Sequence, residues 1–142
     1  MKRKIKIAQN EDEIRNCHAV MGELRPHLEP AEFFAQVKRQ TENSGFKLVY
    51  LSDGEVKAVG GIRTGEWLSG GKYLEIEDLV TKQGEHSNGY GGELFDWIVN
   101  FAKEEKCAQI KLVSHVRRFD AHRFYLNKKM IIEGHYFSLK MK

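Results

Sequence analysis

The chain has 142 residues, 41% of them apolar and 30% charged, which is the composition of a folded globular protein rather than a disordered one. A chain of this length is expected to form one domain, residues 1–142, whose core needs neither disulfides nor a structural metal. It has no run of about eighteen apolar residues, and its basic start lacks the apolar segment of a signal peptide. We therefore expect a cytoplasmic protein with no membrane partner.

The charge and the metal-ligating residues exclude further classes. A net charge of +3 is too mild to argue for a nucleic-acid partner. Cys17 and Cys107 are isolated in sequence, which excludes a disulfide framework or a CxxC metal site. The histidines show no HxxxH spacing, so we expect no metal site.

The first third of the chain predicts one strand and two helices. Isoleucine and lysine alternate over Lys2–Ala8, as in a half-buried strand. Asn10 and Glu13 form a capping-box pattern that starts the first helix, and Pro26 ends it. The second helix starts at Pro30, where the missing N–H of proline costs nothing.

The middle of the chain predicts an antiparallel meander. A turn at Asp53–Gly54 and a loop over Gly65–Gly71 separate three runs that favour strands. The glycine pair Gly60-Gly61 inside the second run predicts a bulge or a close approach by another backbone. The three strands are expected at Phe46–Ser52, Glu55–Thr64 and Tyr73–Thr81.

The last third predicts a βαβ crossover followed by a helix and a strand. The helix Glu93–Lys106 joins the strand at Tyr73–Thr81 to a strand at Gln109–Ser114. Asp120 is expected to cap a short helix, and Met130–Met141 is expected to form a final strand or a bent pair. The fold class is therefore α/β, with a mixed, mostly antiparallel twisted sheet flanked by helices.

The stretch Tyr73–Gly92 carries the first functional signal, because a glycine-rich turn leads from a strand directly onto a helix. The first N–H groups of a helix have no partner inside it and meet the positive end of its dipole, so such a turn suits a phosphate or diphosphate. A dinucleotide fold would need GxGxxG after the first strand, and a P-loop would need Gly-Lys-Ser or Gly-Lys-Thr. This turn follows the fourth predicted strand and has no such lysine.

His86–Gly91, which reads His-Ser-Asn-Gly-Tyr-Gly, resembles the Q/R-x-x-G-x-G/A signature of the GNAT superfamily of N-acetyltransferases. The strand segment Ile76–Val80 is similar to the fourth strand of that family, and Ala121–Tyr125 resembles its second motif, A-x-x-x-Y. The predicted order of elements is the order of the family. The resemblance covers nearly the whole chain and looks closest to small bacterial members that share the Leu-Arg-Pro-His-Leu stretch of Leu24–Leu28.

The resemblance implies the acyl-CoA N-acyltransferase fold, with acetyl-CoA as cofactor. It implies that backbone groups at the end of the fourth strand bind the pantetheine arm and that N–H groups of the turn bind the pyrophosphate. The cofactor-binding residues would be Leu79, Val80, Thr81, His86, Ser87, Asn88, Gly89, Tyr90, Gly91 and Gly92. Tyr125 would stand near the sulfur, where a phenol can return a proton to the leaving thiolate. The alternative is that this ring fills the inward face of its helix.

Two positions in the glycine-rich turn depart from the family pattern. His86 stands where the family has glutamine or arginine, and Asn88 stands where a basic residue is common. Pyrophosphate binding would therefore rest more on backbone donors, with help from Lys82, Arg117 or Arg118.

Two acids on the fourth strand are candidates for the base that removes a proton from the acceptor amine. Glu77 and Glu75 lie two residues apart, so their side chains share one face of the strand. We favour Glu77, directly or through a water molecule, and place Glu75 second. Asp78 points to the opposite face unless a bulge intervenes. The alternative is that the two glutamates form ion pairs with Arg63, Lys111 or another cation across the sheet.

The resulting prediction is an acyltransferase that moves acetyl from acetyl-CoA to a primary amine of a small molecule, peptide or protein, by direct attack in a ternary complex. The acids suggest a cationic acceptor. A non-catalytic acyl-CoA sensor or interaction module on the same fold is the alternative, and nucleic-acid binding through the basic N-terminus is the weakest one. A homodimer through exposed strand edges is a further expectation.

Overall fold

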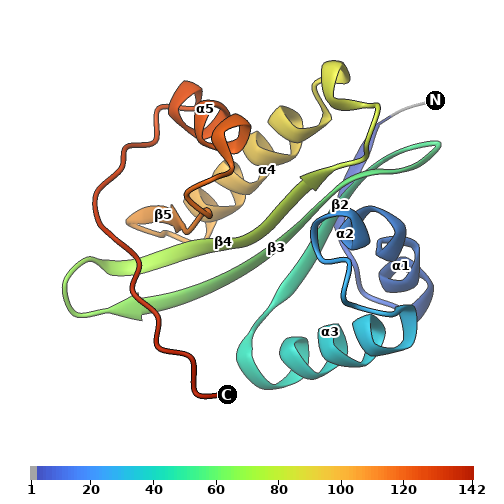
Figure 1. The fold of residues 1–142 in the computed structure, drawn as a ribbon, viewed down its shortest axis with the longest axis horizontal. Coiled ribbons are helices and arrows are strands. Elements are labelled where there is room, and N and C mark those ends of the chain that lie inside the picture. Colours follow the sequence, from blue (N-terminus) through green and yellow to red (C-terminus); the bar gives the residue numbers. More distant parts are fainter. Residues whose placement is uncertain (1–2) are drawn as a thin grey trace. The chain divides into compact units, whose positions relative to one another are not determined.

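The structure is a computed structural model that describes residues 3–142, so Lys2 of the predicted first strand lies outside the described residues. The elements follow the order shown in Figure 1: β1 (Lys4–Ile7), α1 (Glu11–Asn16), α2 (His18–Leu24), α3 (Pro30–Ser44), β2 (Lys47–Asp53), β3 (Glu55–Trp67), β4 (Gly71–Thr81), the 3-10 turn η1 (His86–Asn88), α4 (Tyr90–Glu104), β5 (Gln109–Leu112) and α5 (Phe119–Asn127). Two compact units divide the chain, one ending at Lys111 and one covering Leu112–Lys142, and each is described by itself. The expectation of a single domain stays a prediction.

One five-stranded sheet has the order β1-β2-β3-β4-β5. The pairs β1/β2, β2/β3 and β3/β4 are antiparallel. β5 follows β4 through the helix α4, which is the connection that neighbouring parallel strands require. The predicted α/β class with a mixed, mostly antiparallel sheet is confirmed.

Helices cover both faces of the sheet in the first unit (Figure 1). Helix α4 packs its Leu94 and Ile98 against the strands β2–β4, and all of Leu94, Ile98 and Leu74 are fully buried. On the other face, α1, α2 and α3 bury an apolar cluster against β2 and β3 that includes Val37, Leu48 and Val59. The sheet therefore lies between two apolar interfaces, and β4 runs between β3 and β5. No helix among residues 3–142 is long and apolar enough to cross a membrane.

Several predicted boundaries are wrong. The predicted first helix is divided at Cys17, whose N–H donates to Ile14 O at 3.1 Å in a tighter turn. The predicted loop Gly65–Gly71 is mostly strand, since β3 continues to Trp67 and pairs there with the start of β4. Gly65 lies opposite Tyr73, and a Cβ at Gly65 would come within 2.5 Å of the Tyr73 hydroxyl oxygen. A glycine in this strand makes room for the cross-strand ring. The last helix starts at Phe119, so Asp120 lies in its first turn and is not its cap.

The predicted final strand is also wrong: Met130–Met141 forms neither a helix nor a strand. Apolar side chains alternate in this segment, and Phe137 and Leu139 are 87% and 85% exposed. An alternating pattern describes the two faces of a strand but names no partner, and a strand exists only where a neighbour pairs with it.

Glu13 joins the start of α1 to the sheet. Its carboxylate accepts the N–H groups of Gln9 and Asn10 and the hydroxyl of Tyr50, and it forms an ion pair with Lys6. These contacts lower the pKa of Glu13 from 4.5 to about 2, with the hydrogen-bonded Lys6 as the largest cause. The carboxylate therefore stabilises the folded state above pH 4.5, and this contribution is lost as the pH falls toward 2.

We expect Glu13→Gln to lower the free energy of unfolding at pH 7 by about 1–3 kcal/mol. Urea unfolding between pH 7 and pH 3 should also show a flatter pH dependence for this variant. Glu11→Gln is the matched control, because its ion pair with Arg15 is half exposed and should be worth only about 0.5 kcal/mol. Equal losses in the two variants would contradict the role given to Glu13.

Candidate functional site

A bulge in β4 brings two acids to one face of the strand. Gly61 of β3 lies opposite Asp78, and the next residue, Ile62, lies opposite Ile76, so Glu77 is the extra residue on β4. Strand pairing is thus irregular beside Gly60-Gly61, as expected, but the extra residue lies on β4 and not on β3. Because it shifts the alternation by one residue, Asp78 joins Glu77 on the same face instead of pointing away.

Gly61 provides the space for this arrangement. A Cβ at this position would come within 2.5 Å of an Asp78 carboxylate oxygen and within 2.7 Å of the Phe46 ring. Any larger residue would displace one of them. The absence of a side chain on β3 therefore allows the Asp78 carboxylate and an aromatic ring to lie side by side.

Glu77 and Asp78 lie in the wall of a cavity of about 370 Å³, called here the β4 cavity. It lies within the first unit, between β4, the α2–α3 segment and helix α3. Its volume is at the small end of the range of ligand sites. The cavity is lined by Met21, Arg25, His27, Leu28, Phe33, Gln36, Val37, Gln40, Phe46, Glu77 and Asp78.

An arginine pairs with each of these acids. Arg63 donates from Nε and Nη2 to the two Glu77 carboxylate oxygens, at 2.7 and 3.1 Å. Arg25 donates from Nε to Asp78 Oδ1 at 2.9 Å and from Nη2 to the backbone oxygen of Glu77 at 3.2 Å. Sequence reasoning missed Arg25, although it lies in the Leu24–Leu28 stretch, because the pair spans 53 residues.

Burial and charge act differently on the three acids of β4. Burial raises the pKa of Asp78 above its usual range, and the charge of Arg25 opposes that rise. Glu77 has both oxygens bound by one guanidinium. Glu75 does not line the cavity and forms an ion pair with Lys111 at 3.4 Å. The cross-sheet ion pairs that the sequence left open are therefore present for both glutamates.

The β4–α4 turn, residues 82–89, leads from the end of β4 to the first turn of α4. Gly89 precedes the helix in the left-handed conformation, with φ at 78°. No side chain caps this helix, so the N–H groups of Tyr90, Gly91 and Gly92 stay available for a ligand. A Cβ on Gly91 would come within 2.8 Å of Thr81 Oγ1, so the backbone here comes close to the end of β4.

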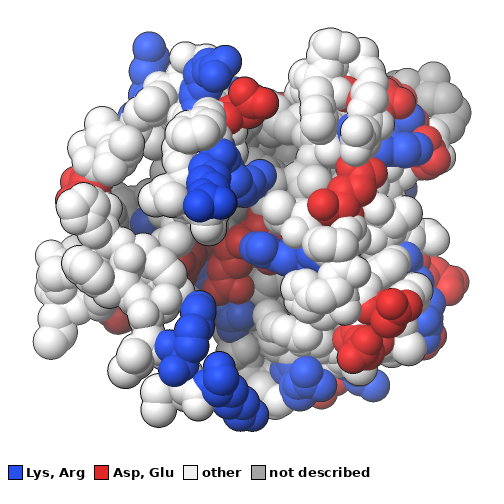
Figure 2. Space-filling view, in the orientation of Figure 1, with Lys and Arg blue, Asp and Glu red and all other residues white. Residues whose placement is uncertain are grey.

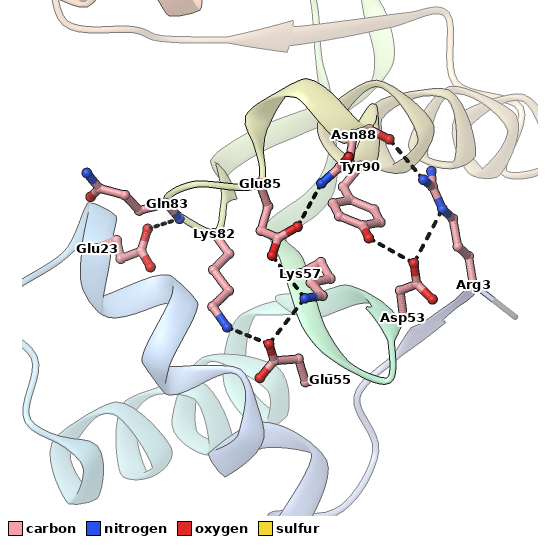
Figure 3. Close-up of polar contacts among 10 residues, drawn as sticks. All are labelled: Arg3, Glu23, Asp53, Glu55, Lys57, Lys82, Gln83, Glu85, Asn88 and Tyr90. Carbon is pink, nitrogen blue, oxygen red and sulfur yellow. Dashed lines mark hydrogen bonds and ion pairs between the residues drawn. The ribbon is translucent and has the colours of Figure 1, made fainter. Parts of the chain in front are cut away.

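Side-chain contacts from other elements hold this turn in place (Figure 3). Lys57 binds Glu85 at 3.2 Å, and Glu85 accepts the side-chain amide of Asn88 at 2.7 Å. Arg3 donates to Asn88 O at 2.9 Å, and the Tyr90 hydroxyl donates to Asp53 at 2.8 Å. The turn is therefore preorganised, and the side chains of Glu85 and Asn88 are used to support it.

The predicted cofactor-binding residues of the turn have the following surroundings in the structure. The His86 ring bonds to Thr81 O at 2.9 Å, and Lys82 pairs with Glu55, so neither side chain is without a partner. Tyr90 is only 6% exposed, and its side chain is bound to Asp53, which leaves its backbone N–H as its contribution to a ligand. Ser87 lies in the 3-10 turn. The structure brings these residues together with Thr81 at one end of β4.

Leu79, Val80 and Thr81 pair with β3 through Gly60, Val59 and Ala58. Since β5 has four residues and β4 has eleven, β5 can pair along only part of β4. Backbone groups on that edge of β4 suit an extended ligand that adds like a strand.

The second unit carries Tyr125 and Ser114. Tyr125 is 9% exposed, and burial raises the pKa of its phenol, with the charge of Arg118 opposing the rise. The buried Ser114 Oγ has no hydrogen-bond partner among the described residues. Buried hydroxyls usually have a hydrogen-bond partner, so a bound ligand is expected to provide the one that Ser114 lacks.

Taken together, the residues fit coenzyme A as a ligand. An uncapped helix start with three successive backbone donors suits a diphosphate, and the partly uncovered edge of β4 suits a pantetheine arm. Among the described residues no group of three His, Cys, Asp or Glu side chains could hold a metal ion.

Comparison with known proteins identifies the family. The model of the acetyltransferase (GNAT) family matches residues 9–130. The uncharacterized N-acetyltransferase YhdJ of Bacillus subtilis (strain 168) is 28% identical over 125 residues, which are 87% of this chain and 88% of that protein.

Two solved structures have the same fold at low sequence identity. A putative acetyltransferase from Agrobacterium tumefaciens str. C58 has a TM-score of 0.84 at 17% identity, covering 97% of this chain and 99% of that one. The aminoglycoside 6′-N-acetyltransferase from Acinetobacter baumannii has a TM-score of 0.82 at 12% identity, covering 99% of both chains. With the family model matching most of the sequence, the chain belongs to the GNAT family of acetyltransferases.

Proposed function

We propose that the protein transfers acetyl from acetyl-CoA to a primary amine by direct attack in a ternary complex. The observation that carries the proposal is the position of β4: its bulge opens onto a cavity with carboxylates, and its end leads to an uncapped helix start. One strand therefore connects an amine-binding site to a diphosphate-binding site. Holding the two reactants in one geometry supplies most of the catalysis in such a reaction.

The cofactor would be bound mainly by backbone groups. Leu79, Val80 and Thr81 would pair with the pantetheine arm, and the N–H groups of Gly89–Gly92 would bind the pyrophosphate. Acetyl-CoA supplies an activated thioester when bound. His86, Ser87 and Asn88 would shape the turn, because the side chains of His86 and Asn88 bond within it.

For the base, the contacts favour Asp78 over the two glutamates. Arg63 occupies both carboxylate oxygens of Glu77, whereas Arg25 contacts Asp78 at Oδ1. Asp78 is buried, has a raised pKa and lies in the cavity wall. A raised pKa brings a carboxylate closer to the range in which general bases work. Glu77 and Glu75 stay predictions as alternative bases.

Tyr125 is the proposed acid that returns a proton to the thiolate, and its raised pKa keeps the phenol protonated at neutral pH. We expect Tyr125→Phe to lower kcat by about 100-fold, the lower end of general-acid effects, with little change in the KM for acetyl-CoA. Tyr136→Phe is the matched control, because Tyr136 is 69% exposed. Steady-state thiol release measures both, and equal rates in the two variants would remove Tyr125 from this role.

The direct test of the function is amine-dependent thiol release from acetyl-CoA, with mass spectrometry to identify the acetylated amine. The proposal predicts release that depends on both the protein and an amine. The competing reading is a sensor that binds acyl-CoA without transfer. Thermal stabilisation by coenzyme A, with no transfer to any amine in a broad panel, would favour the sensor.

A further inference from the structure

The polar end of the β4 cavity has no net charge. Glu77 and Asp78 carry two negative charges, and their partners Arg63 and Arg25 carry two positive ones. Basic and acidic side chains are also interspersed on the face of the molecule drawn in Figure 2. A cavity that attracts a polycation would instead carry an excess of acids. The acids alone suggested a cationic acceptor, and their arginine partners remove that argument.

Arg25 is placed to bind a ligand as well as Asp78. Its side chain lines the cavity and is 41% exposed, whereas the Asp78 side chain is 15% exposed. Its Nε and Nη2 donate to Asp78 and to the Glu77 backbone, and Nη1 has no hydrogen-bond partner within residues 3–142. A guanidinium has five N–H donors, and it binds carboxylates through pairs of them.

The Arg25–Asp78 pair thus presents a positive and a negative group side by side, 2.8 Å apart at their nearest atoms. The ammonium and carboxylate of an amino acid are also held close together, on one carbon atom. An amino acid that lies antiparallel to the Arg25–Asp78 pair would place its ammonium group on Asp78 and its carboxylate on Arg25. Each of these two contacts would be a charge-assisted hydrogen bond, which is stronger than a neutral one and is directional.

The remaining walls would contact a side chain. Phe33, Val37 and Phe46 provide an apolar surface. Gln36 donates to Gln40 at 2.8 Å, so the two amides keep a fixed orientation at the cavity. A cavity of about 370 Å³ admits one small molecule.

We propose that the acceptor is a small zwitterionic amine of amino-acid type, with its amine on Asp78, its carboxylate on Arg25 and an apolar side chain along the aromatic wall. This inference rests on the proposed acetyl transfer and adds the substrate class. In the reaction, the amine nitrogen forms a bond to the acetyl carbon and the carbon–sulfur bond breaks. Of the two protons that the ammonium nitrogen loses, Asp78 takes one and the leaving thiolate takes the other through the proposed acid, Tyr125, so that coenzyme A leaves as the thiol.

The test compares matched acceptors with the native protein. Leucine, methionine and phenylalanine are each assayed beside their amide and their decarboxylated amine, with thiol release as readout. We expect kcat/KM for at least one amino acid to exceed that of both analogues by about tenfold or more. The amides have the lower amine pKa, so their larger share of neutral, nucleophilic amine would by itself favour them over the amino acids. Equal or higher kcat/KM for the decarboxylated amines overturns the substrate class and leaves acetyl transfer intact.

A variant tests the role of Arg25. Arg25→Gln should remove the preference for the amino acid over its decarboxylated amine, and Arg25→Lys should retain part of it. Arg15→Gln, which changes an exposed arginine outside the cavity, should leave the ratio unchanged. A merely structural role would lower both rates and keep their ratio, which would contradict the proposal. If Arg25→Gln does not fold, the acceptor comparison with the native protein decides.

Calorimetric titration separates this inference from the proposed function. The three amino acids and their decarboxylated amines are titrated into protein saturated with coenzyme A. Tighter binding of an amino acid supports the substrate class even if no acetyl transfer is found, in which case the proposed function alone fails. No preference for the amino acids in this titration overturns the substrate class.

Discussion

Asp78→Asn is expected to lower kcat/KM by about 10²–10⁴-fold, the usual contribution of a general base. Asparagine has nearly the same shape, and its amide oxygen can still accept the N–H of Arg25 that Asp78 Oδ1 accepts at 2.9 Å. It cannot take a proton from the amine. The fold and the cavity should therefore persist while proton removal is lost.

The pH dependence gives this prediction a second readout. A base works only when deprotonated, so activity falls as the pH drops through its pKa. Burial raises the pKa of Asp78 above the ordinary value of 3.8, so the acid limb of kcat/KM should lie above that value in the native protein. The part of the acid limb that reports the titration of Asp78 should be absent from the pH profile of Asp78→Asn. The remaining pH dependence of kcat/KM in this variant should reflect only the ionisation of the amine.

Two variants on the same strand serve as controls. Glu75→Gln changes an acid outside the cavity and should leave kcat/KM close to the native value. Glu77→Gln removes the ion pair and one of the two bonds to Arg63, and it should lower stability more than it changes the pH profile. A flattened acid limb in Glu77→Gln, with a native profile in Asp78→Asn, would move the base to Glu77.

Gly89→Val is expected to raise the Kd for acetyl-CoA by about tenfold or more, as loss of one or two charge-assisted hydrogen bonds would. Gly89 has φ at 78°, where a β-branched residue costs about 1–2 kcal/mol of strain. Nothing lies within 4 Å of the Cβ that valine would add, so the effect acts through the backbone. Relief of the strain should turn the first N–H groups of α4 away from the pyrophosphate.

Gly45→Val is the matched control for this variant. Gly45 ends α3 with φ at 70° and also has nothing within 4 Å of an added Cβ. Both variants should lose similar stability in urea unfolding, whereas calorimetry should show weaker acetyl-CoA binding only for Gly89→Val. If the two variants bind acetyl-CoA equally, the diphosphate does not bind at this turn.

Features that depend on residues close together in the sequence, such as helix ends, were predicted correctly. The capping box of Asn10 and Glu13 and the proline that starts α3 are both present as expected. Each of these depends on residues within one helical turn. The glycine pair Gly60-Gly61 likewise predicted a bulge, because glycines inside a strand mark irregular pairing.

Features that depend on distant partners escaped the sequence. The glycines on β3 did not indicate that the extra residue would be Glu77 on β4. Simple alternation along β4 therefore placed Asp78 on the face opposite to Glu77. The pairing of Arg25 with Asp78 joins residues 53 positions apart. The predicted strand at Met130–Met141 failed for a related reason, since alternation alone does not supply a neighbouring strand.

The central claim, that acetyl-CoA binds at the turn between β4 and α4, is tested most directly by amide hydrogen exchange with and without the cofactor. Saturating acetyl-CoA should slow exchange in peptides that cover residues 79–92, where backbone groups would bind the pantetheine arm and the pyrophosphate. Exchange in α3, Pro30–Ser44, serves as the internal reference and should change far less. Unchanged exchange over residues 79–92 at saturating acetyl-CoA would contradict the account.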